Sequence, residues 1–234
     1  MKSALLTGVG RQGQVGEAVA ARLVADGYEV ILVDRDEENV KARASELRAT
    51  GGRAHPFVAD LSDEQSVLDL FTRVRSAHGN QLSAFIHLAG GFAVTGPVAD
   101  TKVEDWEKQL TINLRTAFLA SRSIIPMLRS TRGSMVFFSS ESALPGAKLA
   151  RTSAYAVAKS GLLTLAISIS QEESASGVRA NILAPAAIRT TANVADMAAN
   201  AKFVEREDVA ATVSWLCSDA AAAVTGQVIR LGPR

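Results

Sequence analysis

The sequence predicts an α/β protein built on one doubly wound parallel sheet with helices on both faces. Segments of strand and helix character alternate along all 234 residues. The strands are near-continuous apolar runs such as Glu29-Val-Ile-Leu-Val-Asp34, which is typical of strands covered on both faces. A glycine-rich turn joins the first strand to the first helix. Right-handed crossovers then place a ligand site at the carboxyl ends of the strands.

About seven strands are expected, because seven short apolar runs are separated by turn or helix signals. They cover residues 4–6, 29–34, 54–58, 82–88, 134–138, 178–183 and 227–231.

The helices are expected between these strands, at residues 15–26, 36–50, 62–77, 101–129, 156–170 and 207–219. Gly27 and Gly51-Gly52 stand where helix C-terminal caps are wanted. Ser62-Asp-Glu-Gln65 and Thr101-Lys-Val-Glu104 have the spacing of capping boxes. Pro126 is expected to disturb the long helix that contains it.

Length and composition indicate one globular domain over residues 1–234, with 47% apolar and 21% charged residues. A net charge of +1 gives no reason to expect nucleic acid or an anionic membrane as partner. No apolar run approaches the roughly 18 residues that a membrane span needs. The first eight residues run directly into the glycine turn, so no signal peptide is expected. We therefore expect a cytoplasmic protein.

Cysteine and histidine usage argues against disulfides and metals. Cys217 is the single cysteine and lies in an apolar run, as a buried structural thiol would. His55, His78 and His87 are scattered and show no metal-ligand spacing, so no metal is expected.

Tyr155 and Lys159 stand four residues apart in a segment rich in Ala, Leu and Ile. On a helix they share a face, and a lysine beside a phenol is expected to lower the pKa of the tyrosine from about 10 towards neutrality. Such a tyrosine exchanges a proton with an alcohol or carbonyl oxygen. A plain surface pair has the same spacing, so the pair alone decides nothing.

The first turn, Thr7-Gly-Val-Gly-Arg-Gln-Gly-Gln-Val-Gly16, contains the pattern Gly8-x-Gly10-x-x-Gly13. Glycines there let the backbone approach a pyrophosphate, which the N-terminus of the following helix holds. Asp34 ends the second strand, where a carboxylate would bond an adenosine ribose. A tight turn and a solvated carboxylate are the competing explanations.

Over its whole length the chain resembles the short-chain dehydrogenases/reductases. The similarity rests on the order and spacing of motifs along the alternating pattern: Thr7-Gly8, Asp60-Leu61, Ala89-Gly90, Asn113, Ser139-Ser140, Tyr155-x-x-x-Lys159 and Pro185-x-x-Ile188-x-Thr190. The resemblance implies a Rossmann-type fold and an NAD(P)-dependent oxidoreductase that interconverts an alcohol and a carbonyl.

The resemblance implies a role for each matching residue. Tyr155 is the acid/base, Lys159 lowers its pKa and holds the nicotinamide ribose, Ser140 orients the carbonyl, and Asn113 holds a water that links Lys159 to solvent. The remaining matches imply cofactor contacts. They are Gly8, Gly10, Arg11, Gly13, Gln14 and Val15 at the turn, Asp34 and Arg35, Asp60 and Leu61 beside the adenine, Ala89 and Gly90 along the ribose, and Ile188 and Thr190 at the carboxamide.

The chain departs from the family pattern in four places. Its glycine turn is about two residues longer, so the phosphate contacts at Gly13 and Gln14 are open. His87-Leu88 replaces an Asn-Asn pair, removing an amide that braces the sheet, and Ala186 replaces a glycine after Pro185. Ser140 lies 15 residues before Tyr155, where the family commonly has 13. Strand register favours Ser140 as the catalytic serine, whereas strict counting picks Ser142.

Asp34 favours NAD(H), because its carboxylate accepts bonds from ribose hydroxyls and repels a 2′-phosphate. Arg35 would partly offset this, so NADP stays possible. Residues 186–204 are expected to form a substrate lid over a small, partly apolar alcohol or carbonyl, with Phe92, Val94 and Leu144 as apolar wall.

The apolar sides of the Tyr155 helix suggest a subunit interface, and the resemblance implies a homodimer or homotetramer. They comprise Leu162, Leu163, Leu165, Ile167 and Ile169. Two other functions stay open. One is a nucleotide-binding regulator or scaffold without turnover, and the other a reductase of quinoid or enone substrates in which Ser140 is dispensable.

Overall fold

The computed structural model describes residues 2–233 and contains one seven-stranded sheet in which every neighbouring pair is parallel. The strand order is β3-β2-β1-β4-β5-β6-β7. The strands are β1 (Ser3–Thr7), β2 (Glu29–Asp34), β3 (Ala54–Val58), β4 (Ala84–His87), β5 (Ser134–Phe138), β6 (Arg179–Pro185) and β7 (Val228–Leu231). The predicted doubly wound sheet is confirmed, and each predicted strand end lies within two residues of the observed one.

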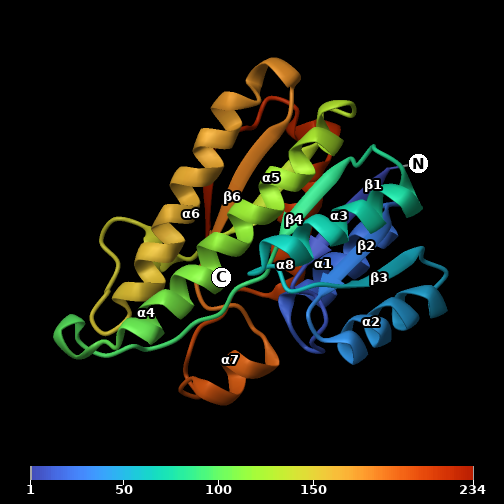
Figure 1. The fold of residues 1–234 in the computed structure, drawn as a ribbon. Helices are drawn as coiled ribbons and strands as arrows, with labels where there is room; N and C mark the ends of the chain where they lie inside the picture. The colour runs from blue at the N-terminus through green and yellow to red at the C-terminus, as the bar shows by residue number, and fades with distance from the viewer. Residues whose placement is uncertain (1, 234) are drawn as a thin grey trace.

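Helices cover both faces of the sheet (Figure 1). One face carries α3 (Glu64–His78), α5 (Thr116–Arg129) and α6 (Ser153–Glu172), with α4 (Val103–Leu110) continuing the line of α5. The other face carries α1 (Val15–Ala25), α2 (Glu37–Ala49) and α8 (Arg206–Cys217). A short helix, α7 (Thr191–Asp196), stands apart from both layers at one end of the molecule.

Two cores form because alternate residues of each buried strand point to opposite faces. Leu5 and Ile31 face the layer of α3, α5 and α6, whereas Leu6 and Leu32 face the layer of α1, α2 and α8. All four side chains are fully buried. This explains why the strands read as continuous apolar runs.

The long helix predicted over 101–129 is broken at a different place from the one expected. α4 and α5 are joined by a π-helical turn, η2 (Thr111–Arg115), and α5 runs through Pro126 to Arg129. The extra residue of a π turn is a common feature of functional sites. Here it is centred on Asn113.

Both predicted capping boxes are wrong. The N-cap of α3 is Asp63, one residue after the predicted Ser62. The carboxylate of Asp63 accepts from the N–H of Ser66 at 2.6 Å, whereas the hydroxyl of Ser62 donates to Asp60. α4 has Lys102 at its N-cap without a side-chain bond, because the hydroxyl of Thr101 donates to the carbonyl of Pro97 at 3.0 Å. A side chain that could cap a helix does not do so when it forms a hydrogen bond with another nearby group.

Three further expectations meet the structure here. Cys217 is buried, and burial raises the pKa of its thiol to about 12, as suits a structural residue. Contrary to expectation, one helix among the described residues, α6, is long and apolar enough to cross a membrane. Its Leu162, Ala166 and Ile169 instead pack into the core. The histidines are not all scattered, since the fold brings His55 and His78 together with Glu29.

Candidate active site

The candidate site lies where the strand order reverses, between β1 and β4, at the carboxyl ends of the strands. The turn after β1 approaches the segment after β4 so closely that a Cβ on Gly8 would stand 2.7 Å from Cα of Ala89. Gly8 also has φ of +71°, which disfavours side chains. Both facts explain why glycine is needed at this position.

The N–H groups of the turn glycines are already used within the chain. Gly8 donates to the carbonyl of Val33 at 2.9 Å, and Gly10 donates to Oδ2 of Asp34 at 2.9 Å. Gly13 donates to Oε2 of Glu17 at 2.5 Å. The donors that remain for a phosphate are therefore sought at the start of α1, which begins at Val15, although the N–H of Glu17 there already donates to the carbonyl of Gln14 at 3.2 Å.

This turn fits a dinucleotide by shape. A Cβ on Gly10 would lie 3.1 Å from the carboxylate of Asp34, and one on Gly16 would lie 2.9 Å from Cα of Val9. Gly16, which was not among the predicted site residues, thus provides the close packing of helix on strand that the dinucleotide turn requires. Gln14 occupies the N-cap of α1, and Arg11 is exposed beside the turn.

Asp34 is the last residue of β2, and Asp60 lies two residues after the end of the neighbouring strand β3, on the expected adenosine side. Asp34 Oδ1 accepts from the N–H of Asp36 at 3.2 Å, so both its oxygens are oriented by the backbone. Hydrogen bonds from Ser62 lower the pKa of the Asp60 carboxyl, and the nearby Arg35 contributes to the same effect. Leu61 is buried beside it.

Ser140 and Tyr155 meet at the end of β5. Ser140 lies two residues after Phe138, the last residue of β5, and its hydroxyl forms a side-chain hydrogen bond with the phenol of Tyr155. The ring of Phe92, one of the predicted wall residues, packs edge-on against Tyr155 at 5.1 Å between centroids. Ser142 instead donates its backbone N–H to Oγ of Ser140 at 3.2 Å.

The expected lowering of the tyrosine pKa is not found. Burial raises the pKa of the Tyr155 phenol, and the hydrogen bond with Ser140 opposes that rise. Lys159 shares the same face, with Nζ 5.8 Å from the centre of the tyrosine ring, but its ammonium donates to the carbonyl of Phe138 at 2.7 Å. The charge is therefore committed to a backbone oxygen, and burial lowers the pKa of Lys159 to about 8.

Asn113 is fully buried, which excludes the alternative of a surface side chain. Its Nδ2 donates to the carbonyls of Gly91 and Gln109, at 2.9 and 3.1 Å, and its Oδ1 accepts from the N–H of Gly91 at 3.0 Å. A Cβ on Gly90 would stand 2.6 Å from Oδ1 of Asn113 and 3.2 Å from Nζ of Lys159. Asn113 and Lys159 therefore both lie next to Gly90.

The role of His87 in the site was not predicted from the sequence. It is fully buried at the end of β4, and its Nδ1 lies 3.0 Å from Oγ1 of Thr7 on β1. Its Nε2 lies 3.3 Å from Oγ1 of Thr116 on α5. The imidazole thus braces the sheet where an amide was expected to be lost. Burial and the neighbouring Lys159 lower its pKa to about 3, so the ring is neutral.

Residues 186–204 fold over the same end of the sheet. Ile188 pairs with Val204 in a short parallel bridge, and Thr190 caps α7 by accepting from the N–H of Asn193 at 3.1 Å. The N–H of Thr191 donates to the carbonyl of Gly13 at 3.0 Å, so this segment contacts the glycine turn directly.

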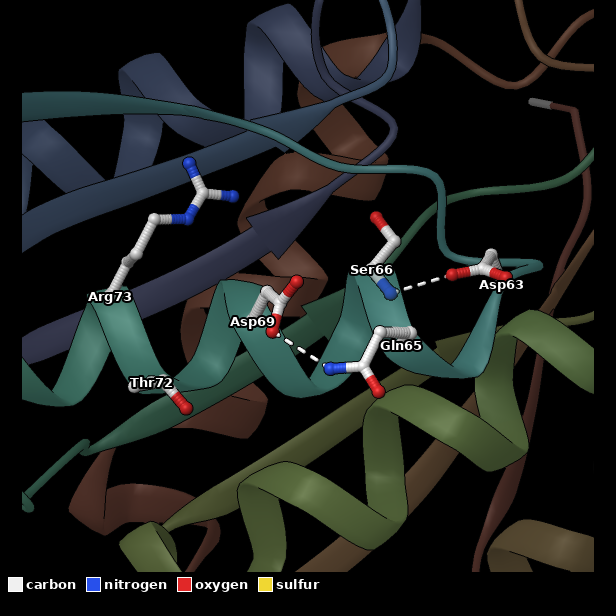
Figure 2. A pocket seen from close by; sticks show the side chains of 6 residues that line it. All are labelled: Asp63, Gln65, Ser66, Asp69, Thr72 and Arg73. Carbon is white, nitrogen blue, oxygen red and sulfur yellow. Dashed lines mark hydrogen bonds between the residues drawn. The ribbon is translucent and has the colours of Figure 1, made fainter.

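A surface hollow lies away from the strand ends. It has a volume of about 650 Å³ and follows one side of α3 (Figure 2). Its lining consists of Asp63, Gln65, Ser66, Asp69, Thr72 and Arg73. Figure 2 shows these side chains along one helix, with Gln65 bonded to Asp69 and Asp63 to the backbone of Ser66. None of them is a candidate site residue, so chemistry and topology place the site at the strand ends instead.

A serine, a tyrosine and a lysine at the carboxyl edge of a doubly wound sheet, next to a turn shaped for a dinucleotide, define the class of nicotinamide-dependent oxidoreductases. A family model described as enoyl-(acyl carrier protein) reductase matches residues 8–231. The chain belongs to the short-chain dehydrogenase/reductase family.

Similar proteins agree with this assignment. The chain is 31% identical over 227 residues to a hydroxy-methyl-oxo-hexahydroindene-carboxyl-CoA reductase of Mycobacterium tuberculosis, covering 92% of this chain and 86% of the relative. It is 27% identical over 243 residues to 2-(S)-hydroxypropyl-CoM dehydrogenase 3 of Xanthobacter autotrophicus, covering 97% and 94%. A solved short-chain dehydrogenase/reductase of Mycobacterium ulcerans superposes with a TM-score of 0.89 at 30% identity, covering 99% and 88%.

Proposed function

We propose that this protein is an NAD(P)-dependent oxidoreductase that interconverts an alcohol and a carbonyl, with Tyr155 as the acid/base. The observation that carries the proposal is the hydrogen bond between the hydroxyl of Ser140 and the phenol of Tyr155, with Nζ of Lys159 on the same side of the ring. Two hydroxyls that meet at one point bind a single substrate oxygen between them. When bound, the nicotinamide supplies or accepts the hydride.

In the reductive direction, Tyr155 donates its proton to the carbonyl oxygen. Its raised pKa keeps the phenol protonated at neutral pH, so the group is ready to act as an acid. Ser140 donates a hydrogen bond to the same oxygen and holds the carbonyl in position. The edge of the Phe92 ring against Tyr155 restricts the access of water from one side.

Lys159 and Asn113 assist Tyr155 without contacting the substrate in this proposal. The ammonium of Lys159, with a pKa of about 8, is close enough to neutral pH to give up and regain a proton as Tyr155 is reprotonated. Asn113 holds the backbone of Gly91 through two hydrogen bonds and so fixes the segment against which the ribose would lie. In this proposal Lys159 returns the proton to Tyr155, whereas Asn113 is a positioning residue for the cofactor.

NAD(H) is the proposed cofactor, with NADP(H) as the alternative. The carboxylate of Asp34 lies at the end of β2 with its oxygens fixed by Gly10 and Asp36. A ribose hydroxyl adds a favourable bond to this carboxylate, whereas a 2′-phosphate would meet its negative charge. Arg35 is near Asp60, which reduces its availability to offset the repulsion.

The proposed substrate is a modest, partly apolar alcohol or carbonyl under a lid formed by residues 186–204. Phe92 and Val94 are well exposed beside the site and supply apolar surface. Arg189, which was considered as a partner for an anionic substrate, pairs instead with Glu205 at 2.8 Å. The names of the two relatives above specify substrates attached to coenzyme A and to coenzyme M. Substrates attached to a thiol carrier therefore belong in the screen.

We also propose that the protein is a cytoplasmic homodimer or homotetramer that associates through α5 and α6. Of the five apolar residues expected to form that interface, Leu162 and Ile169 are buried in the core, whereas the other three are only partly buried against it, namely Leu163, Leu165 and Ile167. The exposed apolar residues on this side are different ones, namely Phe118, Leu149 and Val157. A hollow of about 430 Å³ runs along α6 beside Leu149 and Val157.

The test has two parts. Titration with NADH and NADPH, followed by the fluorescence of Trp106 and Trp215, shows which cofactor binds. A panel of ketones, secondary alcohols and their thioester-carrier forms then tests turnover. The proposal expects binding of at least one cofactor and turnover of at least one panel member. Failure of both cofactors to bind would overturn it, and binding without turnover would favour the regulator or scaffold instead.

A further inference from the structure

A cluster of two histidines and one glutamate lies at the end of the sheet opposite the candidate active site. Glu29 is the first residue of β2, whose last residue is Asp34 at the site end. His55 is the second residue of the edge strand β3, and His78 is the last residue of α3. The cluster therefore joins three elements and has no part in the proposed reaction.

The register of the sheet explains why these side chains meet. Ile31 pairs with His55 across β2 and β3, so Glu29, Ile31 and His55 point to the same face of the sheet. Ile31 belongs to the core beneath α3. His78 ends α3 over that face, and its ring packs against Phe57 at 5.9 Å between centroids.

The three potential ligand atoms lie within 4.8 Å of one another. Nε2 of His55 is 2.7 Å from Oε1 of Glu29, and Nδ1 of His78 is 3.4 Å from the same oxygen. The two imidazole rings stand edge to face, 4.5 Å apart. Nε2 of His55 is buried and, although it lies 2.7 Å from Oε1 of Glu29, it makes no hydrogen bond of good geometry among the described residues.

We propose that Glu29, His55 and His78 form a binding site for a divalent transition metal, with Zn²⁺ as the best fit. Two imidazole nitrogens and one carboxylate oxygen are ligands that Zn²⁺ prefers, and a water completes the tetrahedron. Zinc bonds of about 2.0–2.2 Å place tetrahedral ligand atoms ~3.4 Å apart. The distance from His78 to Glu29 already matches this, and the one from His55 to Glu29 needs a small side-chain rotation.

The consequence is structural. A bound ion would tie the edge strand β3 and the end of α3 to β2, and so would stabilise the folded chain in proportion to metal concentration over Kd. His87, the one histidine outside the cluster, would not contribute. The metal would not change turnover, because the site lies at the other end of β2.

The experiment uses tag-free protein, purified with chelator and then dialysed. Zn²⁺ binding is measured by calorimetry and by the shift in melting temperature, and Co²⁺ is added as a spectroscopic probe of coordination. The variants are Glu29→Gln, His55→Ala and His78→Ala. Two matched controls are His87→Asn, for loss of a histidine, and Glu38→Gln, for loss of an exposed carboxylate.

The proposal expects one Zn²⁺ per chain, a melting temperature that rises with Zn²⁺, and visible Co²⁺ bands typical of a tetrahedral site. Each cluster variant should weaken the affinity by about tenfold or more, while both controls keep the wild-type affinity. Equal affinity in the wild type and the cluster variants would overturn it. So would stabilisation that follows only pH, which would mean that the histidines share protons with Glu29 and bind no metal.

Discussion

Asn113 and Gly91 form a reciprocal pair of hydrogen bonds in which one side-chain amide satisfies both polar groups of one residue of backbone. Gly91 donates to Oδ1 at 3.0 Å, and Nδ2 donates to the carbonyl of Gly91 at 2.9 Å. The π-helical turn η2 directs Asn113 into the protein for this purpose. A continuous α-helix across residues 103–129 would place this side chain differently.

We therefore expect Asn113→Ala to lower both stability and turnover. Two partly buried backbone groups lose their partners, and the cost is at most about 1–3 kcal/mol each. The free energy of unfolding from urea titration checks the first effect, and kcat checks the second. The exposed Asn80→Ala serves as control and should stay within about 0.5 kcal/mol of the wild type. An Asn113→Ala variant as stable as this control would contradict the role given to the amide.

His87 should make the protein sensitive to acid. Its pKa is about 3 in the folded protein and about 6.5 when unfolded, so the unfolded chain binds more protons between these values. The free energy of unfolding then decreases as pH falls below 6.5, by about 1.4 kcal/mol per pH unit. The loss is about 2 kcal/mol at pH 5.

His87→Asn removes this titration and tests the point directly. Its unfolding free energy should fall less steeply than that of the wild type between pH 6.5 and 4. Parallel pH profiles for the two proteins would show that the buried imidazole is not the group responsible.

Asp34→Asn should shift cofactor preference towards NADP(H). The amide keeps an acceptor for the N–H of Gly10 but removes the charge that repels a 2′-phosphate. We expect the ratio of Kd values for NADPH and NADH to change by about tenfold or more, which corresponds to ~1.4 kcal/mol. Glu38→Gln removes a nearby exposed charge as a control. An unchanged ratio would remove Asp34 as the selective residue.

Gly13→Ala should disturb the contact between the glycine turn and the lid. A Cβ at this position would overlap with Oγ1 of Thr191, and φ of +72° adds backbone strain. KM for the substrate is expected to rise several-fold as α7 is displaced. Adding Thr191→Gly removes the overlapping hydroxyl and should restore part of the loss. If the double variant has the same KM as Gly13→Ala, the overlap is not the cause.

The sheet could be predicted from sequence because its signals are local and redundant. Apolar runs such as residues 29–34, glycines after helices, and the alternation of strand and helix all require the same fold. Helical spacing placed Tyr155 and Lys159 on one face, whereas Ser140 came from the family resemblance, with strand register favouring it over Ser142. The structure brings Ser140, Tyr155 and Lys159 together.

The features that could not be predicted depend on which groups the fold brings together to form hydrogen bonds. The charge of Lys159 is taken by the carbonyl of Phe138, so the pKa of Tyr155 follows burial instead of the lysine. The bracing role of His87 depends on Thr7 and Thr116, which are far from it in sequence. The meeting of His55 and His78 depends on a strand and a helix end in the same way.

The central claim is that Tyr155 transfers the proton to the substrate oxygen. The most direct test is the single-turnover rate of carbonyl reduction by Tyr155→Phe, measured with the preferred cofactor bound at saturation. The phenylalanine keeps the ring contact with Phe92 but removes the hydroxyl that meets Ser140. We predict a rate lower by about 10²–10⁴-fold with the cofactor Kd unchanged. A rate within a few-fold of the wild type would contradict the account.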